Sequence, residues 1–142
     1  MDCRFCQLRQ ERKKIVYEDQ WVSLFFDMDP IAKGHALIIP NEHYLDIDEI
    51  PDKVLERIWK CAKIYVGLLK YYFKPAGYSM MQNGGAFNDI GHYHLHVFPR
   101  HFPEEFGWTY ADETDPTATD FRALRDMLQI PLSAAMAAES KT

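Results

Sequence analysis

Three histidines at alternate positions constrain the fold of this chain more than any other feature: His92, His94 and His96. The residues that separate and follow them are aromatic or apolar and favour strands, namely Tyr93, Leu95 and Val97. Because successive side chains of a strand point to opposite faces, the imidazoles would line one surface, roughly 6.6–6.8 Å apart, while the other residues enter the core. On a helix the middle ring would point away from its neighbours. The pattern therefore predicts a strand with a reactive face. The alternative is a solvated polar face, which more often carries Lys, Glu or Thr.

The composition indicates a folded domain that handles small molecules. The chain has 142 residues, of which 47% are hydrophobic and 14% aromatic, enough to form one core. Its net charge is −5 and it lacks a long basic stripe, so nucleic acid and acidic membranes are poor partners, although a small nucleotide needs only a few local donors. We expect neither a membrane span nor a secretory signal. The odd number of cysteines, three, favours a reducing compartment, and we expect a cytoplasmic protein.

The periodicity of apolar residues predicts an α+β fold with a five-stranded antiparallel sheet, one long helix and a C-terminal helix. The long helix is expected over residues 52–73, because apolar residues recur at helical spacing and prolines flank the segment. It would cover one face of the sheet and leave the histidine face open. The shorter helix is expected over residues 120–128. We expect a single domain over residues 1–130 and a C-terminal tail over 131–142. The strands are expected over residues 14–17, 21–26, 35–39, 78–82 and 93–98.

The histidine strand has chemical neighbours that point to phosphorus. A neutral imidazole can attack phosphorus or carbon if a neighbour holds it in the right tautomer. The glycine-rich loop over residues 83–91 precedes the strand, and its backbone N–H groups suit phosphate oxygens. His94 beside this loop therefore suggests nucleophilic attack on a phosphorus centre. A different reading makes the three histidines ligands of a catalytic metal ion, since alternate strand positions can chelate.

The chain closely resembles the histidine triad (HIT) family, whose signature is three histidines alternating with hydrophobic residues and followed by two more. Residues 92–98 have this pattern, and Pro99-Arg100 follows, as in many hydrolases of the family. Residues 25–30 and 33–43 resemble its nucleoside-binding half, and 81–84 resemble the segment before its phosphate loop. The resemblance implies cleavage at the α-phosphate of a purine nucleotide derivative, such as a nucleoside phosphoramidate or a dinucleoside polyphosphate. It also implies a nucleotidyl-histidine intermediate and a two-fold homodimer.

The resemblance implies a role for each matching residue. His94 would be the nucleophile, and His96 would contact the phosphate and assist departure of the leaving group. Asp27 would accept hydrogen bonds from the ribose hydroxyls, although a turn-capping role before Pro30 is an alternative. Gln82 matches a phosphate-contacting glutamine, and His35 matches a histidine that supports the triad.

The base slot and the phosphate loop are less well defined. Many members carry a glutamine just before the triad, where this chain has Asn88 and Asp89. Asn88 can replace the glutamine amide, but an ionised Asp89 cannot donate a hydrogen bond and would repel a phosphate. Asp89 would then either turn away to cap the loop, or act as a general acid or contact the leaving group. The apolar candidates for the base slot are Val16, Met28, Phe5 and Leu24.

The pair Cys3-x-x-Cys6 has two readings, redox chemistry and metal binding. A redox pair is expected at a helix start after a strand, and no strand is expected before Cys3. Zinc prefers four ligands drawn from Cys and His. The resemblance supplies the other two, His43 and His92, and so implies a closed structural Zn²⁺ site. For the whole protein, the alternative to an enzyme is a non-catalytic nucleotide-binding sensor or interaction module.

Overall fold

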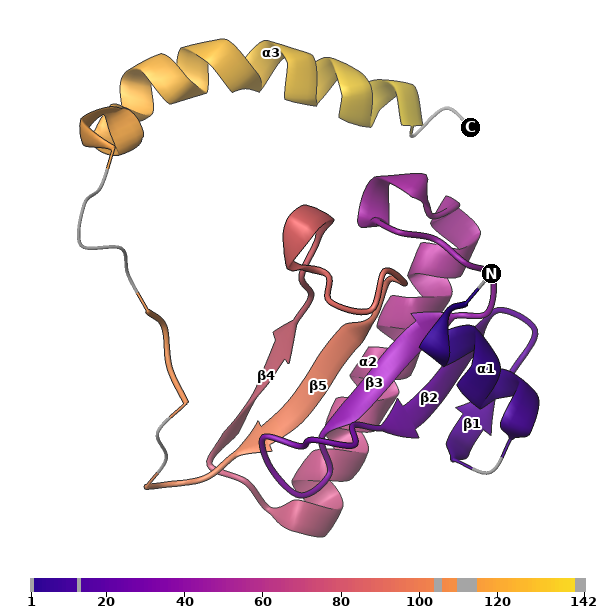
Figure 1. The fold of residues 1–142 in the computed structure, drawn as a ribbon. Helices are drawn as coiled ribbons and strands as arrows, with labels where there is room; N and C mark the ends of the chain where they lie inside the picture. The colour runs from indigo at the N-terminus through magenta and orange to yellow at the C-terminus, as the bar shows by residue number, and fades with distance from the viewer. Residues whose placement is uncertain (1, 13, 104–105, 110–114, 140–142) are drawn as a thin grey trace. The chain divides into compact units, whose positions relative to one another are not determined.

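A computed structural model describes residues 2–12, 14–103, 106–109 and 115–139 (Figure 1). Its contacts divide the chain into two compact units, residues 1–106 and 107–142. The second unit holds the 3₁₀ turn η3 (Pro116–Thr119) and the helix α3 (Phe121–Glu139). The first unit contains α1 (Arg4–Glu11), β1 (Ile15–Glu18), β2 (Val22–Phe26), β3 (Ala36–Pro40), η1 (Ile47–Glu49), α2 (Asp52–Phe73), β4 (Gly77–Met81), η2 (Gly85–Phe87) and β5 (Leu95–Arg100).

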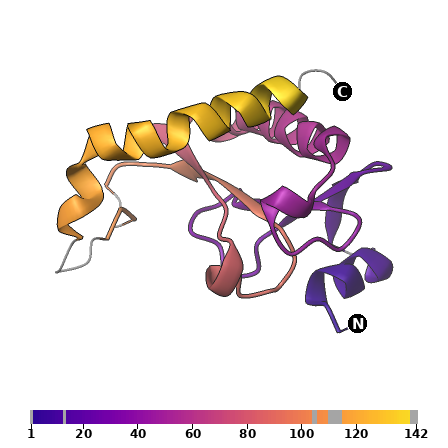
Figure 2. The same ribbon diagram turned by 90° about the horizontal axis from the view of Figure 1, so that it is seen from above.

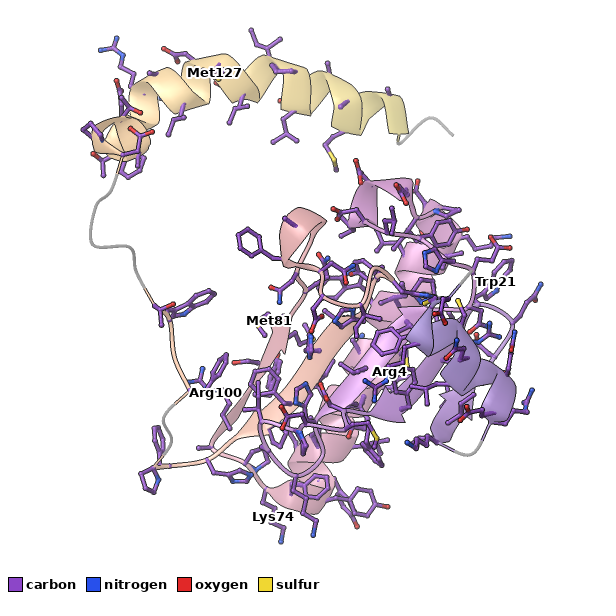
Figure 3. All side chains as sticks on the ribbon, viewed as in Figure 1. Arg4, Trp21, Lys74, Met81, Arg100 and Met127 are labelled. Carbon is purple, nitrogen blue, oxygen red and sulfur yellow. The ribbon has the colours of Figure 1, made fainter. Side chains whose placement is uncertain are left out.

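The five strands form one antiparallel sheet in the order β1-β2-β3-β5-β4, which confirms the predicted α+β class. The central strand β3 is buried along its whole length and joins the two hairpin-like halves of the sheet. It pairs Leu37 with His96 on β5, while Met81 on β4 pairs with His96 from the other side. Figure 3 labels Met81 at the end of β4. The C-terminal half of residues 92–98, here called the histidine segment, is therefore paired on both sides, with β3 and with β4.

The long helix α2 covers one face of the sheet and has the predicted bounds, Asp52–Phe73. Its apolar stripe packs against the sheet, and the buried members are Val54, Ile58, Ala62, Val66 and Leu69. The same core cluster takes up Tyr93, Leu95 and Val97. The alternating pattern is thus confirmed, because these side chains enter the core under α2 and the histidines face the other way.

The N-terminal helix α1 was not predicted, and it covers part of the face that was expected to be open. Phe5 is its buried residue, and it packs edge-on against Phe25 with 5.2 Å between ring centroids. Together with Cys3, Leu37 and Ile39 they form a second, smaller core cluster. Figure 2 shows α1 and α2 on opposite sides of the sheet. A single buried position does not make a periodic pattern in the sequence. This helix is therefore stabilised mainly by its tertiary contacts, and periodicity could not predict it.

The C-terminal helix extends further than predicted, from Phe121 to Glu139 rather than over residues 120–128. The added residues are rich in alanine, the best helix former, and Pro131 lies inside the helix. The expected tail over residues 131–142 is therefore helical as far as Glu139, while the expected domain boundary at residue 130 stays a prediction. None of the helices in the described parts of the chain combines the length and hydropathy needed to cross a membrane.

Candidate active site

His94 lies at the base of a pocket with its tautomer fixed by the backbone. Its side chain is almost fully buried, and its Nδ1 lies 2.8 Å from the carbonyl oxygen of His92. A carbonyl oxygen only accepts hydrogen bonds, so we assign the proton to Nδ1 and a free lone pair to Nε2. The ring of Phe5 packs edge-on against the imidazole, 5.1 Å away between centroids. Nε2 of His94 therefore faces the pocket as an oriented nucleophilic nitrogen.

His96 has the opposite tautomer, which is fixed by His35. The backbone N–H of Ile31 donates to Nδ1 of His35 at 3.0 Å, so a neutral His35 carries its proton on Nε2. That Nε2 lies 2.8 Å from Nδ1 of His96 and donates to it. His96 then carries its own proton on Nε2. The neighbouring rings of His94 and His96 lie 4.9 Å apart between centroids. Nε2 of His94 thus offers a lone pair, and Nε2 of His96 offers a proton donor.

Both supporting histidines are neutral near pH 7. Burial lowers the pKa of His35, and the charge of Asp27 opposes this only in part. Burial, together with the neighbouring rings of His94 and His35, lowers the pKa of His96 to about 4. The donor relay from Ile31 through His35 to His96 therefore keeps its direction at physiological pH.

The loop before β3 places His35 accurately because Gly34 makes a tight turn. Gly34 has φ +94°, which L side chains rarely adopt, and a Cβ there would lie 2.9 Å from Cε2 of Phe73. The hydroxyl of Tyr65 on α2 donates to the carbonyl oxygen of Gly34 at 2.7 Å. The helix and the loop are therefore locked together one residue before His35.

Asp27 has the turn-capping role that the sequence offered as an alternative, and one of its oxygens stays available to a ligand. Its Oδ1 accepts a hydrogen bond from the N–H of Asp29 at 2.9 Å and so caps the turn. Its Oδ2 lies 3.5 Å from Nε2 of His35 and 3.7 Å from Nδ1 of His96. These separations are too long for hydrogen bonds, so the second oxygen keeps its capacity to accept from a ligand.

A pocket of about 210 Å³ opens beside these histidines. The predicted residues that line it are Asp27, Met28, His94 and His96, together with Phe5 and Asp89. Five other lining side chains lie in segments that the sequence analysis had assigned to nucleotide binding, namely Phe25, Phe26, Asp29, Leu37 and Ile90; it missed the remaining two, Arg4 and Leu8. Figure 3 labels Arg4 on α1, whose position over the sheet no sequence pattern indicated. The lining thus combines apolar side chains with three carboxylates, two imidazoles and one guanidinium.

Two base-slot candidates, Val16 and Leu24, lie elsewhere. Both line a groove between β1 and α2, on the face opposite the triad. The pairing of β1 with β2 shifts register between Ile15 and Tyr17, and Tyr17 pairs with Leu24. Ile15 pairs with Phe25, whose side chain lines the pocket, so alternation from Ile15 directs Val16 to the opposite face, where the bulge also leaves Tyr17. The structure therefore does not bring Val16 to the pocket.

Gln82 and Asn88 hold the loop together in this structure. Nε2 of Gln82 donates to the carbonyl oxygen of Asn83 at 2.7 Å. The amide of Asn88 donates to the carbonyl oxygen of Leu45 at 3.1 Å, and its oxygen accepts from the N–H of Gly91 at 3.0 Å and of Ile90. Asn88 thus performs the capping considered for Asp89. Phosphate contacts by Gln82 and Asn88 stay predictions.

A second cluster brings together the four predicted metal ligands, Cys3, Cys6, His43 and His92. Their ligand atoms all lie within 4.8 Å of one another. Nδ1 of His92 is 3.4 Å from Sγ of Cys3 and 3.6 Å from Sγ of Cys6, which in turn is 3.7 Å from Nδ1 of His43. The carbonyl oxygen of Pro40 lies 3.0 Å from Nε2 of His92 and accepts its proton, so Nδ1 points its lone pair at the sulfurs.

The chemistry of this donor set fits a metal ion that prefers nitrogen and sulfur. Burial lowers the pKa of His92 to about 4, which leaves the ring neutral, as ligation requires. All three cysteines are free thiols. Burial and the neighbouring Cys3 raise the pKa of Cys6, so its thiol holds its proton until a cation displaces it. Two thiols and two imidazoles suit tetrahedral coordination.

A third group of potential ligands, Asp27, His35 and His96, is better suited to directing protons. A histidine that ligates through Nε2 must carry its proton on Nδ1. In His35 that position faces the N–H of Ile31, and two donors would oppose each other. The rings of His92, His94 and His96 likewise have different partners, which are the cysteine sulfurs, the carbonyl oxygen of His92 and the ring of His35, and this disfavours their use as ligands of one catalytic metal.

Comparisons with known proteins agree with this geometry. The family model of the HIT domain matches residues 9–103. An uncharacterised HIT-like protein of Methanocaldococcus jannaschii is 38% identical over 103 residues, which are 70% of this chain and 79% of that protein. An adenosine 5′-monophosphoramidase of Saccharomyces cerevisiae is 33% identical over 121 residues, 80% of this chain and 73% of the yeast protein. A crystal structure of a HIT family protein from Bacillus anthracis matches with a TM-score of 0.80 at 26% identity and covers 94% of this chain and 96% of that chain. This chain therefore belongs to the histidine triad family.

Proposed function

We propose that the protein is a nucleotide hydrolase or transferase that cleaves purine nucleotide derivatives at the α-phosphate. The substrates would be nucleoside phosphoramidates or dinucleoside polyphosphates. The observation that carries the proposal is the pair of opposite tautomers, a lone pair on His94 and a donor on His96, in one pocket. The yeast relative is named as an adenosine 5′-monophosphoramidase, which supports a nucleotide substrate.

The reaction would use the two tautomers in turn. Nε2 of His94 attacks the α-phosphorus and forms a nucleotidyl-histidine as the bond from phosphorus to the leaving group breaks, and the leaving group departs with that electron pair. Nε2–H of His96 donates to a phosphate oxygen, whose charge rises in the transition state. Water then attacks the adduct and releases the nucleotide and free His94. His35 acts through His96 and is a positioning residue.

The nucleoside would bind beside Asp27. Oδ1 of Asp27 is occupied by the turn, whereas Oδ2 can accept a hydrogen bond from a ribose hydroxyl. Met28 and the apolar walls of the pocket would contact the base. Purine selection, the homodimer and a cytoplasmic location stay predictions.

The Cys3, Cys6, His43 and His92 cluster would hold a structural Zn²⁺ ion. When bound, the ion would cross-link α1, the segment after β3 and the start of the histidine segment. His92 contributes its ring to this cluster and its carbonyl oxygen to His94. The cluster therefore orders the nucleophile through one shared residue.

The test is the intact mass of the protein after brief mixing with an adenosine phosphoramidate or a diadenosine polyphosphate. We expect an adenylyl mass increment on wild type and on His101→Asn, a matched variant of an exposed histidine outside this pocket. His94→Asn should show neither increment nor turnover. Retained turnover in His94→Asn would remove this residue from the nucleophile role.

A nucleotide-binding sensor without turnover is the second candidate. The observation that favours it is Asp89, whose Oδ1 lies 3.8 Å from Nε2 of His94, where a carboxylate would repel a phosphate. Tight nucleotide binding by wild type, with neither adduct nor product from either substrate, would support the sensor.

A further inference from the structure

The charged groups of the pocket are unevenly divided. Three carboxylates line it, from Asp27, Asp29 and Asp89, against one guanidinium, that of Arg4. Of the two histidines that line it, His96 is neutral near pH 7 because burial lowers its pKa to about 4. A substrate phosphate brings further negative charge, so the pocket as a whole disfavours an additional anionic group.

Asp27 and Asp89 lie at different ends of the histidine pair. Asp27 approaches His35 and Nδ1 of His96, and its side chain is only 19% exposed. Asp89 approaches Nε2 of His94, and its side chain is 83% exposed. Asn88 holds the backbone around Asp89 through the N–H groups of Ile90 and Gly91. The loop therefore keeps this carboxylate beside the nucleophile while the carboxylate itself faces solvent.

The positions of Asp27 and Asp89 indicate where the two halves of a substrate would bind. If the ribose binds at Asp27 and the phosphorus lies over Nε2 of His94, the leaving group extends toward Asp89. We infer that Asp89 is a specificity-determining residue that selects an amine leaving group and rejects an anionic one. The inference rests on the proposed function and narrows its substrate class to nucleoside phosphoramidates.

The step that Asp89 favours is the departure of a protonated nitrogen. The phosphoramidate nitrogen takes a proton from solvent, and the nearby carboxylate stabilises the resulting N–H⁺ group. Nε2 of His94 forms its bond to phosphorus as the P–N bond breaks, with both electrons going to nitrogen. A neutral amine leaves. Water then attacks phosphorus, the electron pair returns to His94, and the proton lost by water ends on the released amine.

The solvent exposure of Asp89 sets the expected size of its effect on kcat/KM. Because Asp89 is largely solvated, the appropriate limit is that of two charges about 4 Å apart in water, which corresponds to about fivefold in an equilibrium or rate. The same charge acts with opposite sign on an anionic leaving group. Wild type and Asp89→Asn should therefore differ by about 25-fold in their preference between the two kinds of substrate.

The experiment compares kcat/KM for an adenosine 5′-phosphoramidate of a primary alkylamine and for diadenosine triphosphate, whose leaving group is ADP. Asp89→Asn should lose activity toward the first substrate and gain activity toward the second. Asp48→Asn is the matched control, because it removes the same charge from the exposed turn η1, outside the pocket. Its preference should equal that of wild type. At about 1 M salt, where the screening length is about 3 Å, the preference of wild type should shrink toward that of Asp89→Asn.

Each outcome has a separate meaning. An unchanged ratio of the two kcat/KM values in Asp89→Asn, or an equal loss on both substrates, would overturn the inference while the enzyme assignment stands. A salt-independent preference in wild type would also overturn it. If wild type turns over neither substrate, the proposed function fails, and the inference fails with it.

Discussion

The relay from Ile31 through His35 to His96 can be cut at either of its two bonds by a matched pair of substitutions. In His35→Asn the side-chain oxygen takes the place of Nδ1 and can still accept from the N–H of Ile31, but the side chain is too short to reach His96. In His35→Gln the terminal amide takes the place of Nε2 and can still donate to Nδ1 of His96. The glutamine variant therefore keeps the bond that sets the tautomer, and the asparagine variant loses it.

The expected magnitude follows from the hydrogen bond that His96 loses in His35→Asn. A buried acceptor left without its partner costs about 1–3 kcal/mol, which corresponds to about 5- to 150-fold in a rate. The carboxylate of Asp27 lies 3.7 Å from Nδ1 of His96 and would draw the proton to that nitrogen. Nε2 would then present a lone pair to the substrate phosphate. We expect His35→Asn to lose kcat/KM within this range, mainly through kcat, and His35→Gln to stay within about threefold of wild type.

The assay is steady-state kinetics on an adenosine phosphoramidate, with urea unfolding as the control for stability. Each variant loses one hydrogen bond, so their free energies of unfolding should be similar, and a purely structural role for His35 would not separate their activities. The ¹⁵N NMR spectrum reports the tautomer directly and should show the proton of His96 on Nε2 in wild type. Equal activity of the two variants, or a wild-type His96 protonated on Nδ1, would refute the relay.

Two further predictions concern the metal cluster and pH. Purified protein should contain about one equivalent of zinc, measured by elemental analysis. Cys6→Ser should lose this zinc, and Cys61→Ser, which changes a cysteine of α2 outside the cluster, should retain it. Less than half an equivalent in wild type prepared without chelator would contradict the site. The pKa of His96 lies at about 4 in the folded protein and near 6.5 when exposed, so the unfolded state binds the extra proton between these values. The stability that depends on His96 is therefore complete above pH 6.5 and lost as the pH falls toward 4, by up to about 3 kcal/mol. Urea unfolding across this range should show a steeper loss for wild type than for His96→Asn, and parallel curves would show that His96 does not contribute.

The periodicity of apolar residues was sufficient to predict the long helix and the two faces of residues 92–98. The bounds of α2 and the two faces of the histidine segment were confirmed, because the apolar stripe and the alternation each span many residues. The four members of the Cys and His cluster were placed together by family resemblance rather than by spacing, since His43 and His92 are distant in the chain.

What the sequence could not supply depends on single tertiary contacts. Phe5 determines that α1 packs on the histidine face, and one buried residue leaves no pattern to recognise. Val16 faces away from the pocket because Ile15, the residue before it, pairs with Phe25 on the pocket side. The tautomer of His96 depends on the backbone N–H of Ile31, a group that every residue except proline carries and that no side-chain motif can reveal.

The two faces of residues 92–98 also bear on how the protein can evolve. Tyr93, Leu95 and Val97 belong to the core under α2, while the histidines between them belong to the Cys and His cluster and to the pocket. Substitutions can therefore alter the core or the chemistry separately, one face at a time. An insertion or deletion of one residue would turn every following side chain over and place imidazoles in the core and apolar groups in the pocket. The spacing of this segment is thus under two independent selections, so its length should be far less free to drift than the identity of its core residues.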